Sequence, residues 1–133
     1  MELAARKSSV PVALGEVARR QNISEKYLWH VVTPLKKARL LNAVSGPRGG
    51  YSLARPAASI TLRDILVAVE DGDSLVECLV NTGLCSRSAT CAAREVWRDL
   101  DRKIGAITQS VTLEDMEKKQ QDLKSVEALE YVI

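Results

Sequence analysis

Residues 12–53 of the chain, VALGEVARRQNISEKYLWHVVTPLKKARLLNAVSGPRGGYSL, decide the fold. Their first part, residues 12–21, places Leu14, Val17 and Ala18 on one side of a helical wheel and polar residues on the other. Apolar residues at this spacing predict a short amphipathic helix that packs through that side.

A turn and a second helix follow. Asn22 tolerates the left-handed conformation that ends a helix, Ile23 is expected to be buried behind it, and Ser24 can accept a backbone N–H as the cap of the next helix. Two helices joined by so short a turn, the second capped and basic, predict a helix-turn-helix. The residues expected on the core side of the second helix are Leu28, Val31 and Leu35.

Two short apolar segments, residues 40–45 and 51–53, flank the turn sequence Gly-Pro-Arg-Gly-Gly at 46–50. This arrangement predicts a β-hairpin. A hairpin directly after a helix-turn-helix is a wing, and Arg48 at its tip can reach a phosphate or the minor groove. The sequence therefore predicts a mainly α-helical winged helix-turn-helix fold with a small β-hairpin.

The second half of the chain is expected to be helical. Residues 59–62 open a helix that ends near 71–73, and a long helix spans residues 92–110. Residues 112–115 cap a short last helix, and the polar segment 117–133 is expected to be a loosely held tail.

The long helix carries an apolar stripe with a charged face opposite. A single stripe of this kind in a small domain predicts packing on a second copy, and packing within the same chain is the alternative. The residues of the stripe are Val96, Trp97, Leu100, Ile104, Ile107 and Val111.

Composition limits the class of protein. The chain has 133 residues, 46% of them hydrophobic and 27% charged, and no apolar run approaches the ~20 residues of a membrane span. The first residues lack the apolar core of a secretory signal, and three cysteines are too few for a disulfide scaffold. A cytoplasmic protein with one domain is expected.

Charge is distributed unevenly along the chain. Residues 1–63 hold eleven Lys and Arg against three acidic residues, a net charge of +8, whereas residues 64–133 hold eight against fourteen, a net charge of −6. A basic first half favours a polyanion as partner of that half, and an uneven surface charge is the alternative.

The three cysteines lie within fourteen residues, in a small, polar segment between two predicted helices. Cys78, Cys85 and Cys91 can converge on one metal centre because thiolates on a loop need only local movement to do so. Thiolate ligands are typical of iron–sulfur clusters and of zinc sites, and an iron–sulfur cluster is the preferred prediction. Both sites usually need a fourth ligand. His30 is distant in the chain, and unliganded thiols or a disulfide switch stay open.

Catalysis finds no support in the sequence. The chain contains no arrangement typical of a Ser/His/Asp triad, no phosphate-binding loop and no pair of metal-ligating carboxylates, and its single histidine lies on a basic helix face. The sequence therefore predicts a protein that is not an enzyme.

Three features together resemble one family. They are QNISEKYL at 21–28 leading into LKKA at 35–38, the wing GPRGGYSLA at 46–54, and the three cysteines followed by VWRDL at 96–100. Over about residues 10–116 the chain resembles the bacterial winged-helix repressors that include the iron–sulfur regulator IscR, the nitric-oxide sensor NsrR and the iron regulator RirA.

The resemblance implies a homodimer that binds duplex promoter DNA. It also implies a 2Fe–2S or 4Fe–4S cluster on Cys78, Cys85 and Cys91 whose state sets the affinity for DNA. A cluster-free dimeric regulator with redox-active or vestigial thiols is the alternative. The residues expected to contact DNA are Ser24, Lys26, Trp29, His30, Lys36, Lys37, Ser45 and Arg48.

The chain departs from the family pattern in several places. The family's complete first helix is expected to be absent here or reduced to residues 1–7, and Arg94 stands where the IscR type has a histidine ligand. The acidic ligand that the NsrR type carries in the first helix is also absent. Ser45 replaces a frequent arginine, and Trp29 replaces an acidic base-reading residue of the IscR type. The fourth cluster ligand is therefore unassigned, and a different DNA site is expected.

These predictions divide the chain into four parts. A winged helix-turn-helix domain covers 1–72 and a cysteine-rich cluster-binding loop covers 73–91. A dimerisation helix with the cap of the next helix covers 92–116, and a polar tail covers 117–133.

Overall fold

The computed structural model describes residues 1–6, 10–70, 72 and 74–132 of the chain. Its first part contains α1 (Leu14–Gln21), α2 (Glu25–Lys37), β1 (Leu41–Val44) and β2 (Gly50–Leu53). Its second part contains the 3₁₀ helix η1 (Ala57–Ser59), α3 (Leu62–Val69), α4 (Glu77–Val80), the 3₁₀ helix η2 (Thr82–Leu84), α5 (Ala92–Ser110) and α6 (Leu113–Glu130). The predicted mainly helical fold with a β-hairpin wing is confirmed.

Local signals place the helix-turn-helix. Asn22 adopts the left-handed conformation at φ 52°, and the Ser24 hydroxyl accepts the backbone N–H of Tyr27 at 3.1 Å. Both agree with the expected turn and cap. Ile23, expected to be buried, is 38% exposed.

The phase of α2 differs slightly from the prediction. Leu28 and Val32 are its buried residues, whereas Val31 and Leu35 are half-buried. The core side of α2 is therefore turned toward Val32. The reason is that α2 packs on both α1 and α3. A stripe of three apolar residues does not fix how far the helix is rotated about its axis between these two neighbours.

The α1 helix begins two residues later than expected because Val12 belongs to the sheet region. Its N–H and its C=O both pair with Tyr51, at 2.9 Å each, so residue 12 lies along the outer edge of β2. Gly50, at φ 152°, permits this approach, since a Cβ there would stand 2.3 Å from the Val12 carbonyl oxygen. The β1–β2 hairpin pairs Leu41 with Leu53 and Val44 with Gly50.

A second backbone bridge joins the start of α3 to the start of α6. The N–H of Leu62 donates to Val111, and the N–H of Leu113 donates to Ile60, each at 2.8 Å. The starts of α3 and α6 thus lie side by side, and the core forms around them. Its buried residues are Leu40, Ile60 and Leu113.

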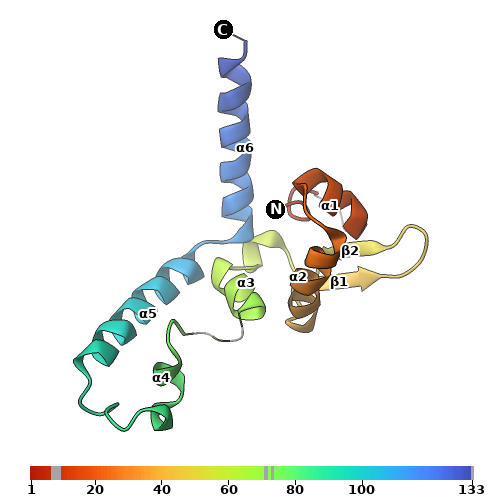
Figure 1. Ribbon diagram of the computed structural model, residues 1–133. Coiled ribbons are helices and arrows are strands. Elements are labelled where there is room, and N and C mark those ends of the chain that lie inside the picture. The colour runs from red at the N-terminus through yellow and green to blue at the C-terminus, as the bar shows by residue number, and fades with distance from the viewer. Residues whose placement is uncertain (7–9, 71, 73, 133) are drawn as a thin grey trace.

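Beyond this junction, α5 and α6 project in different directions (Figure 1). The α5 helix spans the predicted 92–110, but α6 is not short, and it continues through most of the segment expected to be a loose tail. The helix persists because the segment lacks Gly and Pro and contains bonded pairs four residues apart, such as Lys118 with Glu114 and Gln121 with Glu117.

The N-terminal residues form a turn rather than a complete helix. The carbonyl of Met1 accepts the N–H groups of Ala4 and Ala5. An apolar cavity of about 380 Å³ lies between this turn and the winged helix, lined by Leu3, Val17, Leu28, Leu40 and others.

Candidate nucleic-acid interface and cysteine loop

The first candidate site is the outer face of α2. Lys26 and His30, one helical turn apart, lie opposite the buried Leu28 and Val32, and all of the expected contact residues of α2 are exposed. Ser24 caps the helix at its start, and Lys36 and Lys37 lie in its last turn. This arrangement presents the N-terminal half of a helix outward, as a recognition helix requires.

The wing places Arg48 beyond the sheet. The N–H of Gly49 donates to the carbonyl of Gly46 at 2.9 Å, and Gly46 adopts φ 110°, so the turn is closed by backbone alone. Arg48 and Ser45 are both exposed in this loop. The hairpin extends away from the helices in Figure 1, and Arg48 belongs to the turn that connects its two strands.

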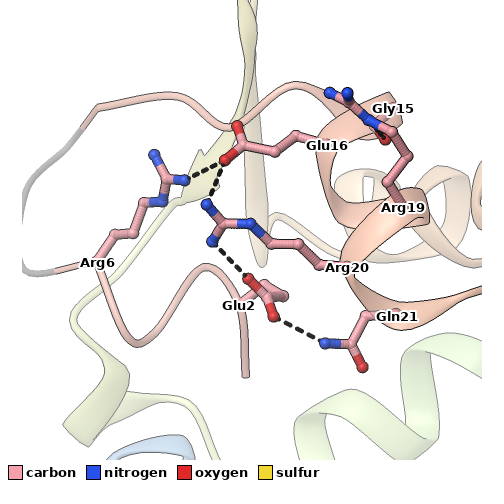
Figure 2. Close-up of polar contacts among 7 residues, drawn as sticks. All are labelled: Glu2, Arg6, Gly15, Glu16, Arg19, Arg20 and Gln21. Carbon is pink, nitrogen blue, oxygen red and sulfur yellow. Dashed lines mark hydrogen bonds and ion pairs between the residues drawn. The ribbon is translucent and has the colours of Figure 1, made fainter.

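The basic residues of the first half of the chain fall into two groups, those that form ion pairs and those that do not. Arg20 binds Glu16 at 2.6 Å and Glu2 at 3.3 Å, and Arg6 binds Glu16 at 2.6 Å (Figure 2). These arginines hold the N-terminal turn onto α1. By contrast, no ion pair involves the cations expected to contact DNA within the described residues, namely Lys26, Lys36, Lys37 and Arg48. Arg19 of α1 and Arg39 also form no ion pair among the described residues, so α2 and the wing carry most, but not all, of the positive charge that lacks an ion-pair partner in this part.

An aromatic contact connects α2 to the wing. The rings of Trp29 and Tyr51 meet edge to face, with centroids 6.3 Å apart and planes at 86°. Trp29 remains 54% exposed, as predicted for a residue beside the core face. Tyr51 was not among the predicted contact residues, because no local sequence signal links it to a residue 22 positions earlier.

The second candidate site is the loop with the cysteines. Cys78 lies in α4 and is half-buried, Cys85 follows η2 and is exposed, and Cys91 is the half-buried N-cap of α5. All three are free thiols. Among the described residues, however, no group of three or more His, Cys, Asp or Glu side chains is arranged to hold a metal ion. The structure therefore places the cysteines on one loop without gathering them.

Two residues of α5 fasten this loop. The guanidinium of Arg94 donates to the carbonyl of Cys78 at 3.1 Å and to that of Ser88 at 3.5 Å. The carboxylate of Asp101 accepts the N–H of Leu75 at 2.8 Å. Arg94 thus joins both sides of the loop, and the loop is hydrogen-bonded directly to α5.

The apolar stripe of α5 is open to solvent in the single chain. Val96, Trp97, Leu100, Ile104 and Ile107 are all exposed, and Gly105 is the one buried residue of the helix. Val111 lies just after the helix, where its carbonyl accepts the N–H of Leu62. Val111 therefore belongs to the bridge between α3 and α6. It was predicted as the last residue of the stripe, but it lies outside the helix that carries the stripe.

Comparison with known proteins settles the family. Residues 1–119 match the profile of Rrf2, described as an iron-dependent transcriptional regulator. The chain belongs to the Rrf2 family of transcriptional regulators. It is 33% identical to protein rrf2 of Nitratidesulfovibrio vulgaris, over 87% of this chain and 77% of that protein. It is 32% identical to the regulator IscR of Xenorhabdus nematophila, over 92% of this chain and 74% of that protein.

Solved structures agree with this family. The chain resembles IscR of T. potens with a TM-score of 0.72 and 31% identity, covering 92% of this chain and 80% of that one. It resembles CymR, the global cysteine regulator of B. subtilis, with a TM-score of 0.71 and 33% identity, covering 89% and 86%.

The family resemblance expected from the sequence is thereby confirmed. Rrf2-family proteins are regulators and not enzymes, so the expected absence of catalysis is confirmed by the relatives. In the described part of this Rrf2-family chain, no helix has the length and apolar character needed to span a bilayer.

Proposed function

We propose that this Rrf2-family chain binds duplex promoter DNA in the cytoplasm as a homodimer and represses transcription. The observation that carries the proposal is the unpaired positive charge on the exposed face of α2 and on the wing tip. Binding of such residues to DNA phosphates is favourable because it releases the counterions condensed on the DNA. Several other basic side chains of the domain are already paired with carboxylates, as Arg6 and Arg20 are with Glu16.

In this proposal, α2 enters the major groove. Its 13 residues span about 20 Å at 1.5 Å per residue, enough to cross the groove. Lys26, Trp29 and His30 lie nearest the bases, and Lys36 and Lys37 lie nearer the phosphates. Ser24 caps the helix at the groove, and the wing brings Ser45 and Arg48 to the adjacent backbone or minor groove.

The test of DNA binding is the salt dependence of affinity for a selected duplex. We expect the slope of log K against log salt to decrease by about one when Lys37 is replaced by Ala. Lys124→Ala removes a lysine that is likewise exposed, from α6, and is the matched control, with no change expected. Binding that is absent, or that does not weaken with salt, contradicts the proposed function.

We also propose that α5 forms the dimer. A stripe of five exposed apolar residues on a 19-residue helix is costly in water, and a second copy buries it through the same residues on both sides. Because dimeric regulators space their two recognition helices through the interface, this seam sets the distance between the half-sites that are read.

For the cysteine loop, we propose an iron–sulfur cluster on Cys78, Cys85 and Cys91. The chemistry of the donors fits, since three free thiols lie in one loop and two of them are only half-buried. Their arrangement does not yet gather them, and a fourth ligand is unassigned. A bound cluster supplies a group that responds to iron, redox state or nitric oxide. Arg94 and Asp101 fasten the loop to α5 and so connect it to the proposed dimer seam.

The test of the cluster is the absorbance of protein purified without oxygen, together with iron, sulfide and zinc assays. We expect broad absorbance near ~400 nm with matching iron and sulfide. Cys85→Ala should abolish the colour and leave the dimer folded, whereas Ser86→Ala on the same loop should leave both unchanged. A coloured Cys85→Ala protein contradicts the ligand assignment.

A second candidate is a cluster-free thiol regulator. Two observations favour it: the cysteines are not gathered, and Arg94 occupies the loop as a cation bonded to two carbonyls. Colourless protein without metal after attempted reconstitution supports this candidate, and colourless protein with zinc supports a structural site.

A further inference from the structure

The contact between Trp29 and Tyr51 gives the DNA-reading helix a fixed aromatic side chain. Centroids 6.3 Å apart and planes at 86° correspond to the favourable edge-to-face arrangement of two rings. Trp29 is in the second turn of α2, where recognition helices contact base edges, and more than half of its surface stays exposed.

Tyr51 is suited to hold the indole in place. Its backbone N–H and C=O both bond to Val12, at 2.9 Å each, and on the opposite side it lies across from Ala43 of β1. Its backbone hydrogen bonds are thus both made to Val12, and toward β1 it is flanked by the register pairs Asn42–Ser52 and Val44–Gly50. Because the backbone of Tyr51 lies between two neighbouring segments, its position in the wing is well defined. The contact with Tyr51 therefore restricts the orientation of the Trp29 indole, which stays exposed beside the wing.

The chemistry of the indole limits which base it can recognise. Indole offers one N–H donor and no acceptor. Guanine is usually read by a pair of donors, adenine by a donor with an acceptor, and cytosine by an acceptor. Thymine alone carries a C5-methyl group in the major groove, which apolar side chains contact. An indole therefore suits thymine best.

The rest of α2 agrees with this choice. From Lys26 to Lys37 the helix contains no acidic residue that could accept from the cytosine amino group. The single carboxylate of the helix, Glu25, lies against Gly15 of α1.

We propose that Trp29 recognises the methyl group of a thymine and that Tyr51 is the positioning residue that holds Trp29 for this contact. The proposal rests on the proposed DNA-binding function and adds to it the class of base that is read.

The experiment begins with full-length protein and a random pool of duplexes, from which bound sequences are selected. Each thymine of the selected motif is then replaced, one at a time, by deoxyuridine, which pairs identically and lacks the methyl group. For the wild-type protein we expect one thymine position per motif copy at which this change weakens binding about fourfold, the equivalent of one buried methyl group.

Variants assign the effect to the two residues. Trp29→Ala should bind more weakly and show no further loss with deoxyuridine at that position. Tyr51→Phe keeps the ring and should retain the fourfold effect, whereas Tyr51→Leu should reduce it to less than about twofold with an unchanged salt slope. Tyr27→Ala removes an exposed aromatic ring from the other flank of the same helix and should retain the full effect. Circular dichroism confirms that each variant is folded.

The outcomes separate the two proposals. If no duplex is enriched, DNA binding itself is contradicted, and this inference with it. If a duplex is enriched but no deoxyuridine weakens binding, or if the loss persists in Trp29→Ala, the thymine assignment is overturned while DNA binding stands. An unchanged fourfold effect in folded Tyr51→Leu overturns the positioning role of Tyr51.

Discussion

Arg39 adopts a backbone conformation that an L-amino acid side chain disfavours. It lies at φ 58°, directly after α2 and its C-cap Ala38. The N–H of Leu40 bonds to the carbonyl of Leu35, and the N–H of Arg39 bonds to that of Lys36, at 3.0 Å each. This pattern is the Schellman motif, whose left-handed position is usually glycine.

We therefore expect Arg39→Gly to raise the free energy of unfolding by about 0.5–1 kcal/mol, because the left-handed strain is removed and only part of the gain is lost to the more flexible unfolded chain. Arg39→Asn should give a smaller gain and Arg39→Val a loss. The measurement is the midpoint of chemical denaturation at constant m-value. A lower midpoint for Arg39→Gly would show that the arginine side chain itself stabilises the fold.

The α6 helix begins with a capping box. The Thr112 hydroxyl accepts the N–H of Asp115 at 3.1 Å, and the Asp115 carboxylate accepts the N–H of Thr112 at 2.9 Å. Hydrogen bonds from the Thr112 side chain, and then from its backbone, lower the pKa of Asp115. The start of α6 thus depends on an ionised carboxylate, while its far end, with exposed residues such as Leu129, has no such support in the single chain.

A lowered pKa in the folded state means that the ionised form of Asp115 stabilises the helix start. This stabilisation is complete above the usual carboxyl pKa of about 3.9 and is lost as the pH falls through the lower folded value. Below about pH 3.9, we expect the amide protons of residues 113–116 of the wild type to lose protection, so that they exchange faster than the pH dependence of the intrinsic exchange rate predicts. Asp115→Asn should remove this extra pH dependence, and Asp122→Asn, an exposed acid within the same helix, should retain it. Identical pH profiles for wild type and Asp115→Asn would refute the role of the box.

The α5 and α6 helices leave one junction in different directions (Figure 1). Although α5 contacts α3 and α4 and α6 contacts η1, both helices keep exposed apolar residues in the single chain. Of these, α5 has the more continuous apolar stripe, since its exposed apolar residues recur at three and four positions over the whole helix. The cysteine loop is fastened to the same helix, so the proposed sensor and the proposed dimer seam share one element.

We expect Leu100→Glu, near the centre of the stripe, to weaken the dimer by at least about 30-fold, because each copy then buries an unpaired carboxylate at the seam. Leu123→Glu makes the same change on α6, at another exposed leucine, and should leave the dimer intact. Sedimentation velocity over a range of concentrations measures both. A dimer of Leu100→Glu as tight as the wild type would place the interface elsewhere.

Features governed by neighbouring residues could be predicted from the chain alone. The caps at Ser24 and Thr112, the left-handed Asn22, the Gly-Pro turn of the wing and the extent of α5 all depend on interactions within a few residues. The length of α6 was also a local property, but its weak amphipathicity concealed it, since polar residues support a helix as well as a tail.

Other features depend on how distant segments pack. The pairing of Val12 with Tyr51, the bridge between residues 61 and 112, and the contact of Trp29 with Tyr51 each join residues far apart in the chain. The distance between the cysteines also lies outside any spacing rule, because three thiols on one loop can point in different directions. Sequence patterns indicate which side chains and backbone groups a segment exposes for interaction. The packing of the helices and the hairpin decides which of those groups come into contact.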